Sequence, residues 1–191
     1  MNIASKALDE YEQHGRLLPD TIKRLIHTIT SSNNPFDAIS AAADTACFHA
    51  AEAVSRRLHD SDPMVRWIAA ATLFTRFRNP RWFAECLDMA ANETDTVVRS
   101  VCLVGVGELL PLVEDCKLRT KGAELLLKIL SDESEFPEIR ADAYEGILAA
   151  LGVFPEDRPS VRDFSAYKKP GAERKIQEFE SRYLGERHSG V

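Results

Sequence analysis

The sequence predicts an all-α fold, a short right-handed α-solenoid of about four helix pairs with a capping helix at each end. Apolar residues recur at helical spacing along nearly the whole chain, and stretches with the alternating pattern of a β-strand are missing. Turn sequences rich in Asn, Asp and Pro separate these helical stretches at short intervals. One helix-forming segment also recurs along the chain, which is typical of repeat proteins.

Length and composition fit a single domain spanning residues 1–191. Hydrophobic residues make up 45% of the 191 residues, enough to build a core. No apolar run approaches the roughly 18 residues of a membrane-spanning helix. The first residues lack the apolar stretch of a signal peptide, so we expect a cytoplasmic protein. The net charge of −6 argues against a protein that binds nucleic acid through its phosphates.

We expect residues 1–16 to form an N-terminal cap, whose acidic helix covers residues 2–14. The repeats follow over residues 17–151. Residues 152–171 contain too many glycines and prolines for one helix and are predicted to form a loop. A charged helix is predicted over 172–184, with Ile176, Phe179 and Tyr183 on a face that docks on other helices. The tail from Gly185 to Val191 is expected to fray.

The repeated segment is clearest over residues 62–73, 95–106 and 136–147. Each copy begins with an acidic or proline-containing turn and then places Val-Arg or Ile-Arg at the same point, which puts Arg66, Arg99 and Arg140 in register. A weaker copy over 34–43 has Ala38 in place of the arginine. An amphipathic helix precedes each copy, over residues 21–30, 50–58, 81–91 and 117–130.

This unit resembles the HEAT repeat family, which is built from a first helix, a short turn and a second helix. The resemblance covers roughly residues 17–151, and its most specific part is the turn and second helix beginning at Asp62. It implies stacked helix pairs, because one pair cannot bury its apolar faces alone. It also implies that the repeated arginines pair with acidic turn residues of neighbouring repeats, with Asp62 and Asp95 as partners. Arginines that bind a ligand are the alternative.

Two details of the second helices favour stacking. In the copy that starts at Asp62, Val65, Ile68 and Leu73 lie on one apolar face, and Met64, Trp67 and Phe74 on a second, as in a helix buried on two sides. In the next copy, Gly105 and Gly107 each cost about 1 kcal/mol relative to alanine in a helix. We therefore expect a close backbone approach there.

The cysteines and histidines show no metal-binding or catalytic pattern. Cys47, Cys86, Cys102 and Cys116 are far apart and are expected to be reduced core residues. The histidines do not cluster either; they are His14, His27, His49, His59 and His188. We find no phosphate-binding loop and no nucleophile motif, and expect no metal and no cofactor.

Charge is unevenly distributed. Residues 56–81 contain six arginines and two acids, a local charge of +4, whereas residues 82–115 contain one base and seven acids, a local charge of −6. Arginine and tryptophan together are typical of protein interfaces. We therefore predict a partner-binding stripe along the second helices, made of the repeated arginines and their neighbours: Arg66, Trp67, Arg99, Leu103, Arg140 and Tyr144.

The favoured function is a non-catalytic protein-binding module, such as an adaptor, inhibitor or assembly factor, that uses the concave face of the second helices. The partner would be another protein, with a homo-oligomer left open. An immunity-type inhibitor of a basic toxin is a sharper form of this hypothesis, because an acidic groove attracts a basic partner.

The alternative is an enzyme. HEAT-like repeats also occur in phycobilin lyases, which act on a tetrapyrrole held in the groove of the solenoid, and in DNA glycosylases. In a lyase, acids on the second helices and turns would serve as general acids. The candidates are Glu108, Glu114, Asp142 and Glu145. A DNA glycosylase is less favoured, because one repeat is basic and the next strongly acidic.

Overall fold

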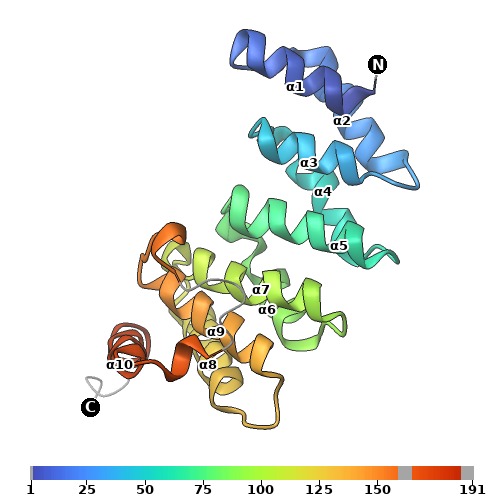
Figure 1. Cartoon of the computed structure of the whole chain (residues 1–191). Helices are drawn as coiled ribbons and strands as arrows, with labels where there is room; N and C mark the ends of the chain where they lie inside the picture. The colour runs from blue at the N-terminus through green and yellow to red at the C-terminus, as the bar shows by residue number, and fades with distance from the viewer. Residues whose placement is uncertain (1, 159–164, 186–191) are drawn as a thin grey trace. The chain divides into compact units, whose positions relative to one another are not determined.

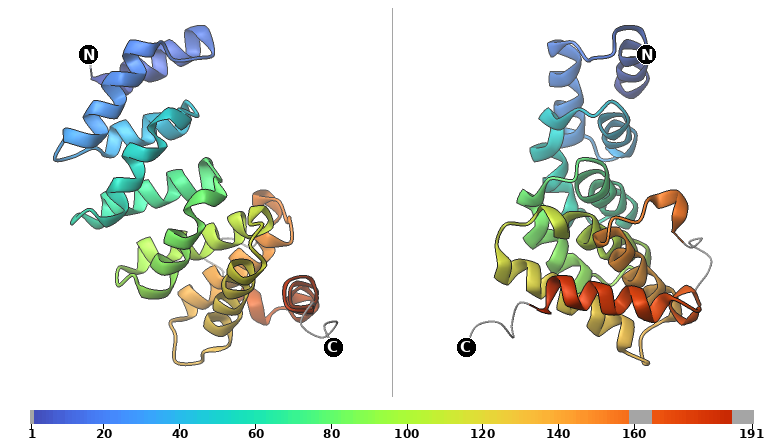
Figure 2. Two further views of the ribbon diagram at one scale, coloured as in Figure 1. Left: turned by 180° about the vertical axis from the view of Figure 1, so that it is seen from behind. Right: turned by 90° about the vertical axis from the view of Figure 1, so that its left-hand side faces the viewer.

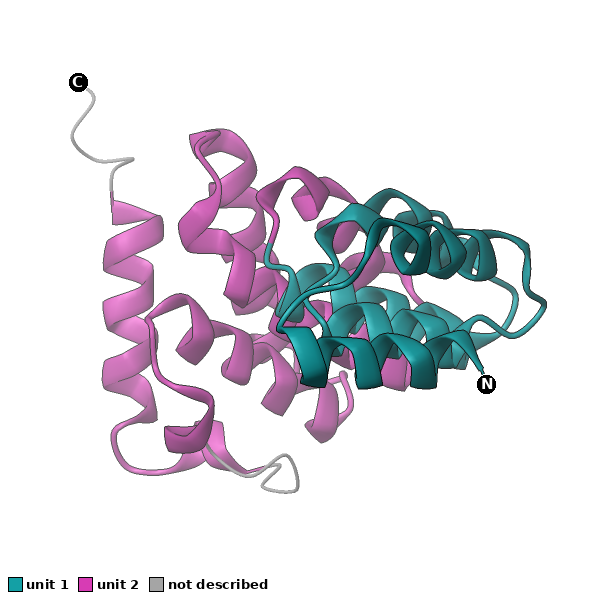
Figure 3. Ribbon diagram, turned by 90° about the horizontal axis from the view of Figure 1, so that it is seen from above, with its two compact units in different colours: residues 1–78 teal, residues 79–191 magenta. Residues whose placement is uncertain are grey.

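The computed structural model describes residues 2–158 and 165–185. In this part of the chain α-helices and short 3₁₀ or π turns follow one another and no strand occurs, which confirms the predicted all-α class (Figure 1). The chain divides into two compact units, residues 1–78 and 79–191, which are described separately (Figure 3). The single domain over 1–191 therefore stays a prediction.

The first unit holds a capping helix and two helix pairs. Helix α1 packs on α2 and α3, and α2 also contacts α4. The predicted helix over 50–58 is broken into three short pieces, η1, α4 and η2. The elements are α1 (Ile3–His14), α2 (Pro19–Ser31), α3 (Phe36–Asp44), η1 (Phe48–Ala50), α4 (Ala51–Ser55), η2 (Arg56–His59), α5 (Pro63–Ala70) and η3 (Ala71–Arg76).

A buried acid ties the N-terminal cap to the first helix pair. Glu10 of α1 is 7% exposed, and its carboxylate accepts hydrogen bonds from the backbone N–H of Leu18 and from the hydroxyl of Thr21. These hydrogen bonds lower the pKa of Glu10, because they stabilise its charged form. The acidic N-terminal helix is therefore docked on α2 by a specific contact.

The second helix of the next pair changes geometry along its length. Residues 71–76 continue α5 as a π-helix, and the N–H of Phe77 bonds the carbonyl of Thr72, five residues back. The hydroxyls of Thr72 and Thr75 donate to the carbonyls of Ile68 and Ala71, both at 2.7 Å. Because these hydroxyls hydrogen-bond to backbone carbonyls of the helix, they favour the wider turn of a π-helix.

The predicted burial of this helix on two faces is confirmed in part. Val65, Ile68, Leu73 and Phe74 are buried, but Met64 is 52% exposed. Met64 is the second residue of α5, so its side chain projects at the helix end, outside the packed part.

The second unit holds two more helix pairs and a C-terminal helix. Helix α6 packs on α7, α8 packs on α9, and α7 packs along α9. These helices lie where the sequence predicts them, because no helix end differs from its predicted position by more than three residues. The elements are η4 (Pro80–Trp82), α6 (Phe83–Asn92), α7 (Thr96–Leu109), η5 (Leu110–Leu112), α8 (Cys116–Ser131), α9 (Pro137–Ala150), η6 (Pro155–Asp157), η7 (Ala166–Lys168) and α10 (Ala172–Tyr183).

Glycines allow α7 and α9 to touch backbone to backbone. A Cβ atom built on Gly107 would lie 1.9 Å from the carbonyl oxygen of Gly146, and one built on Gly146 would lie 2.6 Å from the carbonyl oxygen of Leu103. Real Cβ atoms essentially never approach so closely. The predicted close approach is thus found at Gly107.

The C-terminal helix docks on its own unit. Helix α10 packs against α8 and α9 (Figure 2). Phe179 is fully buried, and the hydroxyl of Tyr183 donates to the carbonyl of Ala150 at 2.9 Å. The predicted docking face of this helix is confirmed. In the described part of the predicted loop over 152–171, the short turns η6 and η7 are the helical elements before α10. The tail that is predicted to fray lies outside the described residues from 186 onward.

The cysteine prediction holds for three of the four residues. Cys47, Cys86 and Cys102 are buried, and burial raises the pKa of the Cys102 thiol to about 12. Cys116 is exposed, which corrects the expectation of a fourth core thiol. The reason is its place as the first residue of α8, about two turns before Ala123, the first buried side chain of that helix.

Candidate functional site

The repeated arginines cap helices. The guanidinium of Arg99 donates to the carbonyl of Ala90 at 3.2 Å, and that of Arg140 donates to the carbonyl of Leu130 at 3.0 Å. Both carbonyls lie in the last turn of the preceding helix, α6 or α8, where backbone acceptors lack a partner within the helix. In the first unit, Arg66 likewise donates to the carbonyl of Asp60 at 2.9 Å, just after η2.

The acidic turn residues cap helices and also provide an ion-pair partner for a repeated arginine. Asp62 accepts a hydrogen bond from the N–H of Met64, and Asp95 accepts from the N–H groups of Val97 and Val98. Each aspartate is therefore the N-cap of its own helix. Arg99 forms its ion pair with Glu135 of the following turn, at 2.7 Å. An arginine thus pairs with an acidic turn residue of the neighbouring repeat, as the family resemblance implies, and the partner of Arg99 is Glu135.

Two members of the predicted partner-binding stripe are not on the surface. Leu103 is fully buried and Tyr144 is 5% exposed, because both lie on the sides of α7 and α9 that pack in the core. These two residues are removed from the stripe. Trp67 is half-buried and stacks on Phe36, with ring centroids 6.2 Å apart. Partner binding by Arg66, Trp67, Arg99 and Arg140 stays a prediction.

A cluster of acids lies where α7 crosses α9. Glu108 follows Gly107 on α7, and Glu145 precedes Gly146 on α9, so the glycine contact also brings these two side chains together. Asp142 lies one turn before Glu145 on the same face of α9. The structure therefore brings together three of the four acids that the sequence offers as general acids. Glu114, the fourth, is exposed in the turn between η5 and α8.

An arginine from the loop after α9 completes the cluster. The guanidinium of Arg158 lies 2.7 Å from the carboxylate of Glu108 and 3.8 Å from that of Glu145. It also donates to the carbonyl of Val153 at 2.9 Å. The Arg158 side chain is only 6% exposed, so its charge needs these partners. The residue lies 50 positions after Glu108, and no sequence pattern connects the two.

The environment favours the protonated form of two of these acids. Burial raises the pKa of Asp142, and Glu138 adds to the effect, while a hydrogen bond with Ser100 opposes it. Burial also raises the pKa of Glu145, with smaller contributions from the negative charges of Asp142 and Glu108 and an opposing one from Arg158. Two of the three carboxyl groups, those of Glu108 and Glu145, lie within 4 Å of the Arg158 guanidinium, and Asp142 and Glu145 retain their protons more readily than a solvated acid does.

Such an arrangement can donate a proton and then hold the resulting negative charge. A carboxyl group of raised pKa is a better general acid near neutral pH than an ordinary one, and Arg158 stabilises the carboxylate that remains after transfer. Among the described residues no group of three or more His, Cys, Asp and Glu side chains is arranged to hold a metal ion.

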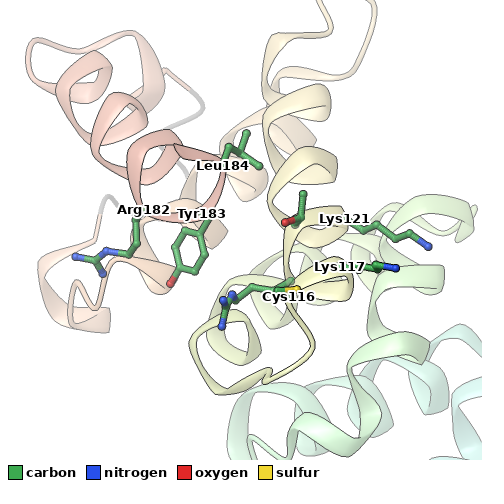
Figure 4. Close-up of a pocket in the computed structure, with 8 residues that line it drawn as sticks. Cys116, Lys117, Lys121, Arg182, Tyr183 and Leu184 are labelled. Atoms are coloured by element: carbon green, nitrogen blue, oxygen red, sulfur yellow. The ribbon is translucent and has the colours of Figure 1, made fainter. Parts of the chain in front are cut away.

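A separate pocket of about 470 Å³ lies between the start of α8 and the end of α10. Four of its eight lining residues are cationic and none is acidic. Figure 4 shows Cys116, Tyr183 and Leu184 between outward-pointing cations. The sequence alone does not reveal this pocket, because its residues come from helices about 60 positions apart.

The fold and the acid cluster define an α-helical repeat protein that carries half-buried titratable groups on its second helices. No protein-family model and no curated protein matches the chain. A solved structure, the complex of CpcE and CpcF of phycocyanin lyase from Nostoc sp. PCC7120, contains a chain of similar fold. The likeness has a TM-score of 0.56 at 21% identity and covers 84% of this chain and 98% of that chain.

This likeness confirms the predicted solenoid class, and it corrects the expectation of a protein that is not an enzyme. That expectation rested on the lack of a catalytic motif, but a chain of the same fold belongs to the complex of a lyase. In a helical repeat, acids far apart in the sequence build the site, so a local motif is not required. Among the described residues no helix is long and apolar enough to cross a membrane.

Proposed function

We propose that this chain is a lyase-type subunit that binds a partner protein and uses the acid cluster on α7 and α9 as its proton donor. The observation that carries the proposal is the half-buried group of Glu108, Asp142, Glu145 and Arg158, in which two carboxyl groups have a raised pKa. The fold likeness to a chain of phycocyanin lyase supports the reaction class.

The chemistry of a lyase suits a donor of this kind. When a group H–X adds across a carbon–carbon double bond, X bonds one carbon and a proton must reach the other. A protonated Glu145 or Asp142 would supply that proton, and the proton lost by H–X would restore the acid. In the reverse reaction the carboxylate would accept the proton instead. Arg158 would hold the cluster together in both protonation states.

Partner binding is the second part of the proposal. The similar solved chain belongs to a complex of two different proteins, CpcE and CpcF. Here Arg66 and Trp67 in the first unit, and Arg99 and Arg140 in the second, are half-buried residues that a partner can reach. No specific observation favours an immunity-type inhibitor or a DNA glycosylase over the lyase.

Co-purification tests the partner. The tagged chain is isolated from its native lysate at low salt and again at about 0.5 M NaCl, where the electrostatic attraction between exposed charges is strongly screened. Mass spectrometry then identifies a bound protein, and the visible absorption spectrum detects a bound tetrapyrrole. We expect a stoichiometric protein partner. A chain that isolates alone at low salt, with no chromophore, would contradict the proposal.

Activity tests the acid cluster. The chain and its partner are incubated with phycocyanin, and the visible absorption of the chromophore reports attachment or release. We expect Glu145→Gln and Asp142→Asn to lower the rate by about 100-fold or more, the usual contribution of a general acid. Glu114→Gln is the matched control, because Glu114 lies outside the cluster. Full activity in both cluster variants would exclude these acids as the proton donors.

A further inference from the structure

The side of α7 that is not packed in the core carries a stripe of valines. Val97, Val101 and Val104 follow one another at i, i+4 and i+7, so they lie on one side of the helix, and Glu108 continues this side one turn further on. Val97 is 56% exposed, and Val101 and Val104 are half-buried. The solvent side of a surface helix is usually polar, so an apolar stripe at this place indicates a contact surface.

A stripe of acids lies beside the valines on α9, which packs along α7 (Figure 1). Glu138, Asp142 and Glu145 also follow one another at i, i+4 and i+7. A hydrogen bond between Asp142 and Ser100 connects the two stripes, because Ser100 lies one turn before Val104 on α7. The valines and the acids therefore form one surface, which we call the valine–acid face.

The first two acids of the valine–acid face lack a cation. Neither Glu138 nor Asp142 forms an ion pair with any residue that the structure describes. Arg158 lies at the other end of the face, beside Glu108 and Glu145. Burial raises the pKa of Asp142, and the negative charge of Glu138 adds to this effect. Uncompensated negative charge therefore lies next to the valines, where it would attract a basic partner.

We propose that the valine–acid face binds an amphipathic helix of the partner protein, with apolar side chains on the valines and lysines or arginines against Glu138 and Asp142. A helix presents its side chains at the same spacing as the two stripes, so it can match both of them. The inference rests on the proposed function, in which a partner protein binds, and gives the chemistry of that partner. An uncharged helix would leave the acids without cations, and a polar basic segment would leave the valines uncovered.

A synthetic peptide serves as the probe. It has about 14 residues, all Leu or Lys, placed so that a helix has one apolar and one basic face. The peptide is added to the full chain with isotope-labelled valine methyl groups, at about 0.15 M salt to screen distant charges. We expect saturable NMR shifts for Val97, Val101 and Val104 and none for Val54 and Val65, which are buried in the first unit. A peptide with Ser in place of every Leu should bind at least about tenfold more weakly.

Charge variants complete the test. Glu138→Gln/Asp142→Asn should weaken binding of the Leu–Lys peptide by about fivefold or more. The control Asp9→Asn/Glu12→Gln removes the same total charge from the exposed side of α1 and should leave binding unchanged. Circular dichroism confirms that both variants fold. Equal weakening in both double variants, equal binding of the serine peptide, shifts away from the valine–acid face, or no binding would each overturn the proposal. This test follows no reaction, so the helix site and the proposed proton donor can fail separately.

Discussion

The guanidinium of Arg158 lies 2.7 Å from the carboxylate of Glu108, although 50 positions separate the two residues in the chain. This ion pair connects the loop after α9 to the last full turn of α7. It also places a positive charge 3.8 Å from Glu145, beside the glycine contact of the two helices. The local fold of the second unit and the chemistry of its acids therefore depend on the same contact.

We predict that Arg158→Gln destabilises the protein and changes the titration of Glu145. Removing the arginine breaks its ion pair with the largely buried Glu108, and breaking such a pair costs about 3 kcal/mol. Because Arg158 lowers the pKa of Glu145, its loss should raise that pKa further. Chemical denaturation and carboxyl NMR measure the two effects. Arg174→Gln, on the exposed face of α10, is the control and should change neither.

Neutralising the acids should have the opposite effect on stability. The folded-state pKa of Asp142 and of Glu145 is raised, so the charged form is disfavoured in the folded protein. Their contribution to stability is present at low pH, below the pKa of the unfolded chain, and is lost as the pH rises through the folded-state pKa. Asp142→Asn and Glu145→Gln should therefore increase thermal stability at neutral pH, relative to wild type, and lose this advantage in acid. A lower melting temperature at neutral pH in both variants would contradict this explanation.

The glycine contact gives a sharp structural prediction. Gly107→Ala should destabilise the protein by about 3 kcal/mol, because the new methyl group would collide with the backbone of Gly146. The same change in an ordinary helix increases stability by about 1 kcal/mol. Gly185→Ala is the control, since no atom lies within 4 Å of the Cβ position there. Urea unfolding measures the stability of both variants. A Gly107→Ala variant as stable as Gly185→Ala would show that α7 and α9 can move apart at little cost, which would contradict the prediction.

Because Arg140 caps the end of α8, we predict that its removal lowers the stability of the protein and leaves the acid cluster unchanged. Arg140→Gln removes the hydrogen bond to Leu130 and the contact with the Tyr167 ring, whose centroid lies 4.9 Å from the guanidinium carbon. A loss of about 1–2 kcal/mol is expected. Thermal unfolding measures it. If Arg140→Gln folds as stably as wild type but no longer binds a partner, the arginine serves recognition and the capping explanation is wrong.

The helices were predictable because local signals determine them. Asp62 and Asp95 fall at N-caps, Pro63 and Pro137 fall in first turns, and the apolar spacing marks the buried faces. Acids on α7 and α9 were likewise recognisable as candidates. Arg158 was not, because the loop after α9 has no repeat to align and its contact is set by tertiary packing.

The errors have physical causes too. Leu103 and Tyr144 were placed on the surface because repeat alignment gives equivalent positions but not which side of the helix faces the neighbouring helix. Cys116 was placed in the core from its apolar residue type, whereas its position at the start of α8 decides its exposure. A local catalytic motif is a poor guide to catalysis in this fold, because a helical repeat builds a site from residues far apart in the sequence.

The protonation of the acid cluster is the most direct test of the account. Carboxyl-carbon NMR, with uniformly labelled Asp and Glu, follows each side chain as the pH changes, and Asp142→Asn and Glu145→Gln assign the two resonances. We predict that both groups titrate above the ordinary range for Asp and Glu, and that the pKa of Glu145 falls when Asp142 is neutralised. Two carboxyl groups that titrate independently at ordinary values would contradict the proposed proton donor.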